Sequence, residues 1–215
     1  MTVTHDQVLE AIENIAETIE NNETRLNELD SKIGDGDHGV NLKNGFRAVL
    51  ESQEELKAKE DIGAILQEVG QILIDETGGS VGILYGTAFR EAGTAVEGTE
   101  SLELDDMVDM AAAACDEVER RGQVSTGEKT MFDTLKPFSD ALAEAAESGY
   151  SESKALRYAE SKAEEGMVKT EEMVARKGRA KYFGEDTLGH RDVGAVSTYL
   201  ILSTAVETVT EDQSN

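Results

Sequence analysis

The chain is short of proline, cysteine and tryptophan: it contains one proline, one cysteine and no tryptophan. The single cysteine, Cys115, excludes an internal disulfide, and its alanine-rich surroundings favour a small core residue. The N-terminus lacks a basic and then apolar signal pattern, and no run approaches the ~18 apolar residues of a membrane span. These absences predict a soluble, cytoplasmic protein without a membrane contact.

Basic residues are scarce as well, with 20 Lys and Arg against 45 Asp and Glu, which gives a formal net charge of −25. A surface of this charge repels nucleic acid and anionic lipid. The acidic excess is spread along the chain, and regular apolar spacing argues against a disordered acidic protein. We interpret the charge as that of a protein from a salt-loving (halophilic) source, because molar salt shortens the Debye length to ~3 Å.

Apolar residues recur at helical spacing along nearly the whole chain. Thr4 and Gln7 form an expected capping box before the first stretch, Gly122 ends the fifth, Pro137 starts or kinks the sixth, and Asp192 caps the eighth. Sustained two-residue alternation is missing, so no sheet is expected. The pattern predicts an all-α bundle or barrel of about eight amphipathic helices. The stretches are residues 8–19, 42–49, 62–73, 84–92, 104–118, 131–145, about 151–176 and 193–205.

Glycines cluster in four loops between these helices, at residues 29–39, 78–86, 122–130 and 177–194. Since glycine costs backbone entropy, the clustering needs a local reason, which is either tight turns or backbone that comes close to a ligand. Loops at one end of a bundle would serve both. The length predicts a single domain, residues 1–215, with a polar, frayed tail from about residue 207.

The strongest local signal is a carboxylate trio, Asp30, Asp35 and Asp37, between the first two helices. Ionised carboxylates ~4 Å apart repel by ~4 kcal/mol per pair at an effective dielectric near 20, and a divalent cation removes that repulsion. Ligands that are all oxygen favour Mg²⁺ or Ca²⁺. A Ca²⁺-binding EF-hand is excluded, because a loop starting at Asp35 has Gly39 at position 5 and Phe46 at position 12. Spacing alone leaves a metal site and a solvated acidic turn equally open.

Other segments fit either a ligand or a plain structural role. Residues 77–82 open a helix whose free N–H groups favour an anion, or serve glycine-mediated packing. Residues 122–130 miss the P-loop pattern because Glu128 intervenes, and no strand precedes them, so we reject a P-loop. Residues 175–181 hold the densest basic cluster, which suits phosphate binding by one arginine or a cationic helix end. His38 could reach a phosphate or remain a loop histidine without a ligand.

The chain resembles the nucleotide-binding L subunits of dihydroxyacetone kinases in four stretches that occur in the family's order: LDSKIGDGDHGVNLKNGF, GGSVGILYGTAF, RGQVSTGEKTMFDTL and ARKGRAKYFGEDTLGHRDVGA. The resemblance implies a barrel of eight antiparallel helices with ADP or ATP at one end. It implies two Mg²⁺ ions held by Asp30, Asp35 and Asp37, and catalytic assistance from Arg179. It further implies that the nucleotide is contacted by His38, Gly39, Val40, Asn41, Ser80, Val81, Gly122, Met131, Arg179, Asp192, Val193 and Gly194, with Gly122 and Met131 in the adenine pocket.

One position departs from the family pattern. The family commonly has serine where this chain has Val81, so a hydroxyl contact is lost or comes from Ser80, while backbone contacts survive. The resemblance favours the separate-subunit form, whose bound ADP is rephosphorylated by a phosphohistidine carrier (the M subunit), with phosphoenolpyruvate as ultimate donor. The phosphoryl group then passes to dihydroxyacetone on a K subunit. The chain would thus be a phosphotransferase of glycerol metabolism that is active only with partner subunits, and homodimerisation stays open.

Three alternatives stay open from the sequence. The first is an ATP-dependent kinase domain for another small or lipid substrate, which co-purifying partners would reveal. The second is a non-enzymatic ADP-sensing regulator, favoured by a bound nucleotide that never receives phosphate. The third is an acidic helical protein that binds Mg²⁺ or Ca²⁺ and takes up no ADP.

The charge predicts a salt requirement. We expect the protein to melt at a higher temperature in multimolar KCl than in low salt, because screening weakens the repulsion among its carboxylates. Circular dichroism melts in the two salt concentrations measure the difference. A higher melting temperature in low salt would contradict the halophilic interpretation.

Overall fold

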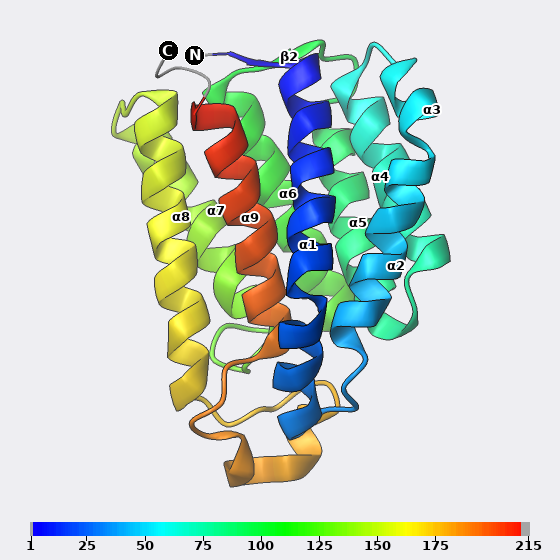
Figure 1. The fold of residues 1–215 in the computed structure, drawn as a ribbon. Helices are drawn as coiled ribbons and strands as arrows, with labels where there is room; N and C mark the ends of the chain where they lie inside the picture. The colour runs from blue at the N-terminus through cyan, green and yellow to red at the C-terminus, as the bar shows by residue number, and fades with distance from the viewer. Residues whose placement is uncertain (1, 212–215) are drawn as a thin grey trace.

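The structure, a computed structural model, describes residues 2–211, with side chains to residue 210. Within this range the chain is almost entirely helical (Figure 1). The α-helices are α1 (His5–Ile33), α2 (His38–Glu51), α3 (Gln53–Lys57), α4 (Ile62–Glu76), α5 (Gly79–Ala95), α6 (Leu104–Gly122), α7 (Phe132–Glu147), α8 (Glu152–Lys169) and α9 (Val193–Glu211). The remaining elements are the strands β1 (Val3–Thr4) and β2 (Ser101–Leu102) and the 3-10 segments η1 (Thr170–Glu172) and η2 (Ala180–Thr187).

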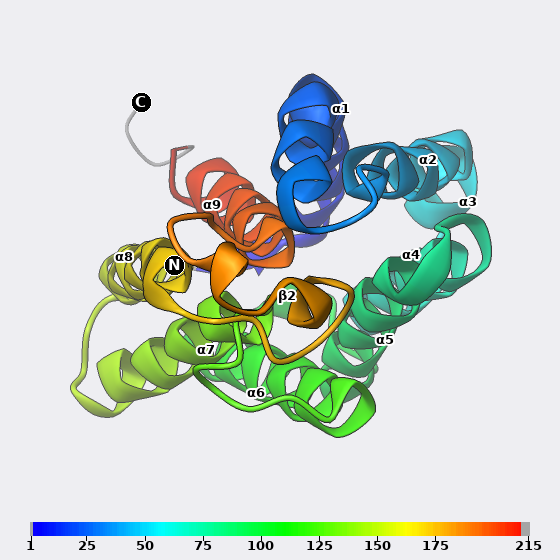
Figure 2. The same ribbon diagram turned by 90° about the horizontal axis from the view of Figure 1, so that it is seen from below.

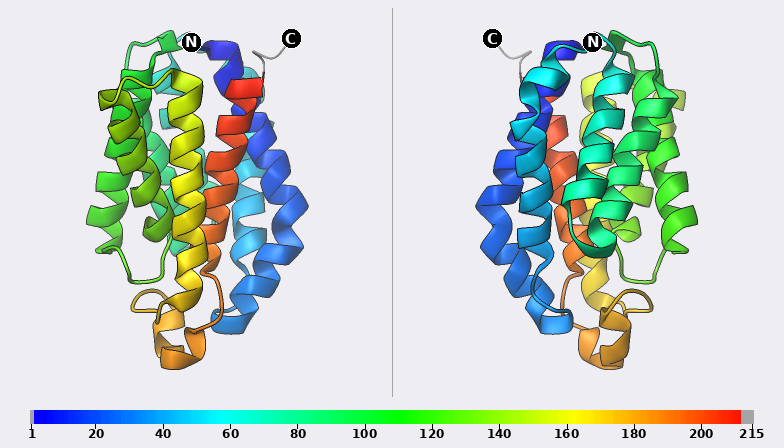
Figure 3. Two further views of the ribbon diagram at one scale, coloured as in Figure 1. Left: turned by 90° about the vertical axis from the view of Figure 1, so that its left-hand side faces the viewer. Right: turned by 90° about the vertical axis from the view of Figure 1, so that its right-hand side faces the viewer.

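The long helices form a closed ring, which Figure 2 shows from below. Around the ring, α1 packs on α2, α2 on α4, and each later helix on the next, until α9 packs back on α1. The chain runs alternately down and up, so neighbouring helices are antiparallel (Figures 1 and 3). The predicted all-α barrel is confirmed.

The apolar stripes of the ring helices face inward and form one core. Ile19, Leu26, Leu42, Ile65 and Val118 are among its fully buried side chains. Each such side chain contributes roughly 1.5–3 kcal/mol relative to an exposed position. An apolar cavity of about 240 Å³ remains inside the barrel. This core fixes the helix ends, and with them the loops.

Backbone contact between α4 and α5 positions the turn that joins them. A Cβ atom on Gly70 would lie 2.4 Å from the carbonyl oxygen of Gly86, closer than real Cβ atoms approach. A Cβ atom on Gly45 of α2 would lie 1.8 Å from Thr77 Oγ1. Glycine therefore lets α4 and α5 touch along their lengths, and lets α2 approach Thr77 just before α5 begins.

The first half of the chain differs from the sequence predictions at two places. The expectation of no sheet is wrong, because β1 and β2 pair antiparallel, with Val3 opposite Leu102. Strands of two residues are too short for an alternating pattern to appear. The short helix α3 was not predicted either, since five residues hold barely one apolar repeat.

Helix ends follow the predicted signals with one shift. The capping box is confirmed, because the Gln7 N–H donates to Thr4 Oγ1 (3.3 Å) and the Thr4 N–H donates to Gln7 Oε1 (3.0 Å). Helix α6 ends at Gly122 as expected, but the left-handed residue that stops it is Gln123 (φ 48°).

Later helix boundaries also need correction. The helix predicted over about 151–176 is shorter in the structure: α8 ends at Lys169, η1 follows, and the backbone is extended at Met173. Pro137 lies inside α7, which begins at Phe132. The tail predicted to fray from about residue 207 is helical to Glu211, and residues 212–215 lie outside the described part.

Helix α9 is strongly apolar. Its window Val193–Thr210 is long and apolar enough to cross a membrane by length and composition, contrary to the sequence expectation. In the barrel 44% of this window is buried, and α9 packs against α1, α7 and α8. Its composition is therefore also that of a core helix.

The four glycine-rich loops lie at one end of the barrel, the lower end in Figure 1, hereafter the loop end. They are the α1–α2 loop, the α4–α5 turn, the α6–α7 loop and the α8–α9 segment with η1 and η2. Figure 2 looks onto this end, where segments far apart in sequence lie side by side. Up-and-down topology produces this gathering, since every second connection falls at the same end.

Candidate functional site

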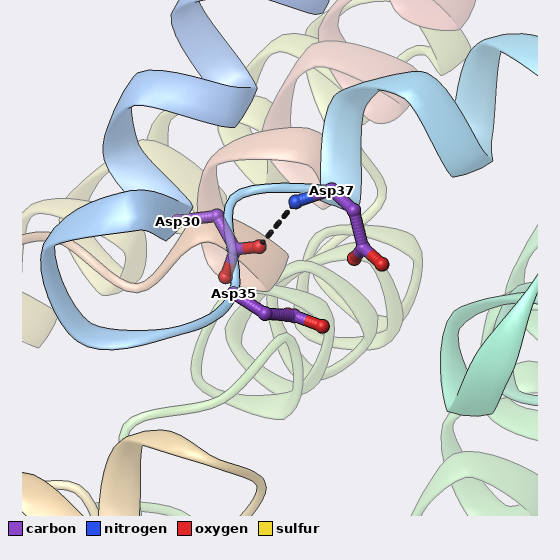
Figure 4. Close-up of side chains that lie close together, drawn as sticks. All are labelled: Asp30, Asp35 and Asp37. Carbon is purple, nitrogen blue, oxygen red and sulfur yellow. Dashed lines mark hydrogen bonds between the residues drawn. The ribbon is translucent and has the colours of Figure 1, made fainter.

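The carboxylate trio lies in the α1–α2 loop (Figure 4). Asp30 is buried in the last turn of α1, and its Oδ2 accepts N–H groups from Gly36 (2.9 Å), Asp37 (3.1 Å) and His38 (3.3 Å). One carboxylate oxygen from each of Asp30, Asp35 and Asp37 lies within 4.8 Å of the others. The chain thus wraps around the Asp30 carboxylate and brings the other two beside it.

Two glycines permit this tight wrapping. A Cβ atom on Gly34 would lie 2.1 Å from Asp30 Oδ1, so a larger residue would displace the carboxylate. Gly36 adopts a φ of +80°, a left-handed conformation that other residues rarely adopt. The glycines of this loop are therefore explained by close approach to a carboxylate.

A cationic side chain already faces the trio. The guanidinium of Arg179, just before η2, forms an ion pair with Asp35, and both side chains remain partly exposed. The guanidinium supplies positive charge where a metal ion would otherwise supply it. Three convergent carboxylates that offer only oxygen are the donor set that Mg²⁺ accepts. The residues present therefore fit a hard divalent cation.

The start of α2 is tied to α1 rather than left open. Asn27 Oδ1 accepts the N–H groups of Gly39 (2.8 Å) and Val40 (3.2 Å). His38 points into the barrel, where its Nε2 lies 2.8 Å from Ser197 Oγ. Burial lowers the pKa of His38 to about 4, so the imidazole is neutral at pH 7 and offers a phosphate no charge. His38, Gly39 and Val40, which were predicted to contact the nucleotide, thus hold the α1–α2 loop in shape in this structure.

The start of α5 lies beside α2. A Cβ atom on Gly78 would lie 3.0 Å from Asn41 Oδ1, so the Asn41 amide closes one side of the turn. Gly78 at the N-cap of α5 has no side chain that could accept the first N–H groups of the helix. Ser80 is exposed and Val81 is half-buried in this first turn. Free N–H groups at a helix N-terminus attract anions such as phosphate.

The α6–α7 loop and the start of α9 form another side, or wall, of the candidate site. A Cβ atom on Gly194 would lie 3.4 Å from Met131 Cβ, and the Tyr85 hydroxyl donates to the Gly194 carbonyl (3.0 Å). Asp192 caps α9 by accepting the Ala195 N–H (2.7 Å). The predicted residues Met131 and Gly194 are therefore in contact.

Two other predicted residues flank this wall. Gly122 ends α6, and a Cβ atom there would lie 3.2 Å from Val124 Cγ1 and 3.6 Å from Leu84 Cδ2. Val193 packs half-buried against the core as the first residue of α9. With these two residues, the trio and the start of α5, each predicted site residue lies at the loop end.

Residues 32–207 match the family model of the DAK2 domain. The chain belongs to the DAK2 domain family. It is 36% identical over 202 residues to the PEP-dependent dihydroxyacetone kinase, ADP-binding subunit DhaL, of Escherichia coli (strain K12), an alignment that covers 94% of this chain and 96% of that protein.

Longer proteins contain a similar domain. The chain is 32% identical over 207 residues to the L-erythrulose 1-kinase of Mycolicibacterium smegmatis, which covers 94% of this chain but 35% of that protein. A crystal structure of the C. freundii dihydroxyacetone kinase in complex with AMP-PNP and Mg²⁺ superposes with a TM-score of 0.69 at 24% identity. That match covers 93% of this chain and 33% of the kinase, and it shows that the fold is shared.

Several side chains that build the DAK2 loop end escaped the sequence analysis. Asn27 lies one helical turn before Asp30, a spacing that places both on one face of α1. Asp133 accepts the N–H groups of Gly127 (2.5 Å) and Thr130 (2.9 Å), and an acidic residue in the first turn of a helix was the available signal. Tyr85 contacts α9 across the barrel, and no local pattern indicates such a contact.

The trio predicts a specific response to magnesium. We expect Mg²⁺ to raise the melting temperature of the wild type in a saturable manner, because it replaces the repulsion among the carboxylates with ligation. Asp35→Ala should need at least a tenfold higher Mg²⁺ concentration to reach half of the maximal rise in melting temperature. Asp109→Ala, an exposed carboxylate on α6, is the matched control and should respond like the wild type. Equal responses of all three proteins would remove the metal site.

Asp192 predicts a pH dependence of stability. Burial raises the pKa of Asp192 from 3.8 to about 7, so its contribution to stability is present below pH 4 and is lost as the pH rises to about 7. Asp192→Asn retains the cap and cannot ionise. The free energy of unfolding of the variant minus that of the wild type should therefore grow between pH 4 and pH 7, by on the order of 1 kcal/mol per pH unit. Urea unfolding in EDTA measures this, and a difference independent of pH would contradict it.

Proposed function

We propose that this DAK2 domain is the nucleotide-carrying subunit of a phosphoenolpyruvate-dependent dihydroxyacetone kinase. ADP held at the loop end would accept a phosphoryl group from a phosphohistidine carrier, the M subunit, and pass it to dihydroxyacetone on a K subunit. The observation that carries this proposal is the convergence of three carboxylates at the start of α2, a helix whose Asn41 lies against Gly78 at the start of α5. Near full-length similarity to an ADP-binding subunit supports it.

Different residues of the loop end would contact the metal ions, the phosphates and the base of the nucleotide. Asp30, Asp35 and Asp37 would hold two Mg²⁺ ions, which neutralise charge on the phosphate oxygens when bound. The first turn of α5, at Ser80 and Val81, would donate N–H groups to a phosphate. Because these are backbone groups, valine in place of serine at position 81 leaves them intact.

Arg179 would change partners during nucleotide binding. Its ion pair with Asp35 engages a carboxylate that a metal ion would also claim. Once Asp35 ligates a cation, the guanidinium is free to turn to a phosphate, for which its planar donors are suited. Arg179 would then stabilise charge on the transferred group, while Gly122, Met131 and residues 192–194 enclose the base.

Exposed apolar side chains support partner docking at this end. Tyr182 is 80% exposed, and the other large apolar residues exposed in the described part lie in or next to η2, at the end of α8 or near the start of α5. These are Ile83, Val168, Phe183 and Leu188. In so acidic a protein, apolar groups around the phosphate site suit a partner that covers the site and excludes water. We propose that residues 1–215 form one cytoplasmic domain that works in this way.

A related ketose is the second candidate acceptor. The similarity to an L-erythrulose 1-kinase means that this domain type also occurs in a protein named for another small ketose. Because acceptor binding would reside on the partner, the two candidates differ in the K subunit rather than in this chain. Product analysis with each ketose separates them.

The docking proposal predicts a separable defect. Tyr182→Ser combined with Phe183→Ser should reduce phosphoryl transfer in the reconstituted three-protein system at least tenfold, because the partner loses an apolar contact. ADP binding should stay within twofold of the wild type. Tyr150→Ser, at the opposite end of the barrel, is the control and should transfer normally. Normal transfer by the double variant would place the docking surface elsewhere, and no transfer by the wild type would refute the proposed reaction.

A further inference from the structure

Lys129 is buried in an unusual way. Its side chain is 1% exposed, and its backbone has a φ of +62°, which non-glycine residues seldom adopt. Burying an ammonium group costs free energy unless it is paired, and an apolar side chain would avoid that cost. The position therefore requires what only the amine supplies.

The amine joins three segments of the loop end. Its Nζ donates to the carbonyl oxygens of Thr170 in η1 and of His190 in the turn before α9. Thr170 Oγ1 in turn accepts the Asp192 N–H (3.1 Å). The α6–α7 loop, η1 and the start of α9 thus meet at this one side chain.

The surrounding charges hold the amine in place. Burial lowers the pKa of Lys129, and Asp192, Glu171 and Asp133 oppose that effect. Asp133 also accepts two N–H groups of the α6–α7 loop, as described above. The loop that carries Lys129 is therefore hydrogen-bonded to Asp133 at the start of α7 and, through the amine, to the turn before α9.

We propose that Lys129 is a positioning residue for the nucleotide, an inference that rests on the proposed function. Met131 follows Lys129 by two residues, and Gly194 follows His190 by four. Lys129 joins the α6–α7 loop to the turn before α9, and thereby sets the contact between Met131 and Gly194. That contact forms the side of the site that is proposed to enclose the nucleotide base. The residue touches no nucleotide in this account and acts through that wall.

Lys129→Met tests the inference, because methionine fills the buried space but cannot donate to either carbonyl. We expect its dissociation constant for Mg·ADP, measured by calorimetry, to rise at least tenfold. Lys162→Met is the matched control, since it makes the same substitution at a partly exposed lysine of α8 that pairs with Glu165 (2.7 Å). Its affinity should stay within twofold, because exposed pairs contribute little.

A purely structural role is distinguished by stability. Leu56→Ala removes a buried side chain in α3, far from the loop end, and should lower the melting temperature without changing ADP affinity in the folded protein. If Lys129→Met folds and binds Mg·ADP as the wild type does, the inference is overturned.

A second variant covers failure to fold. If Lys129→Met does not fold, Thr170→Val removes the hydroxyl that accepts from the Asp192 N–H and donates to the Met167 carbonyl (2.7 Å). This isosteric variant should raise the dissociation constant about fivefold, because the start of α9 loses its hydrogen bond to η1. Unchanged affinity in this variant also overturns the inference. A wild type that binds no Mg·ADP refutes the proposed function instead.

Discussion

Mutual repulsion among three carboxylates is the constraint on which the loop end depends. Asp30, Asp35 and Asp37 place oxygens within 4.8 Å of one another in a chain that already carries a net charge of −25. The structure offsets part of this repulsion with three N–H groups on Asp30 and the Arg179 guanidinium on Asp35. A bound cation would offset the rest, so the loop is built to gain from binding one.

Barrel closure brings the other components to the trio. His38 contacts Ser197, and Tyr85 contacts Gly194, so helices from the start, middle and end of the chain meet beneath the loops. Both contacts end on α9, the helix that closes the ring against α1. Site geometry is thus a property of the complete fold, which explains why its polar residues are distributed over most of the sequence.

Sequence periodicity predicted a helical bundle or barrel because the ring helices carry apolar stripes, and the family resemblance implied the barrel. Periodicity could not predict α3 or the paired strands, which are too short to show a period. The carboxylate trio was visible locally, since its members lie within eight positions. Lys129 and Tyr85 were not, because their roles arise from contacts between segments that only the closed barrel joins. The inward orientation of His38 was hidden for the same reason.

Native mass spectrometry of the purified protein, in volatile salt with Mg²⁺, tests the central claim most directly. The account predicts a folded species that carries the added mass of ADP and magnesium, either retained through purification or taken up on addition of ADP. A folded protein that stays free of nucleotide when ADP and Mg²⁺ are supplied would contradict the account. The loop end would then be an acidic turn stabilised by Arg179 and the backbone N–H groups on Asp30.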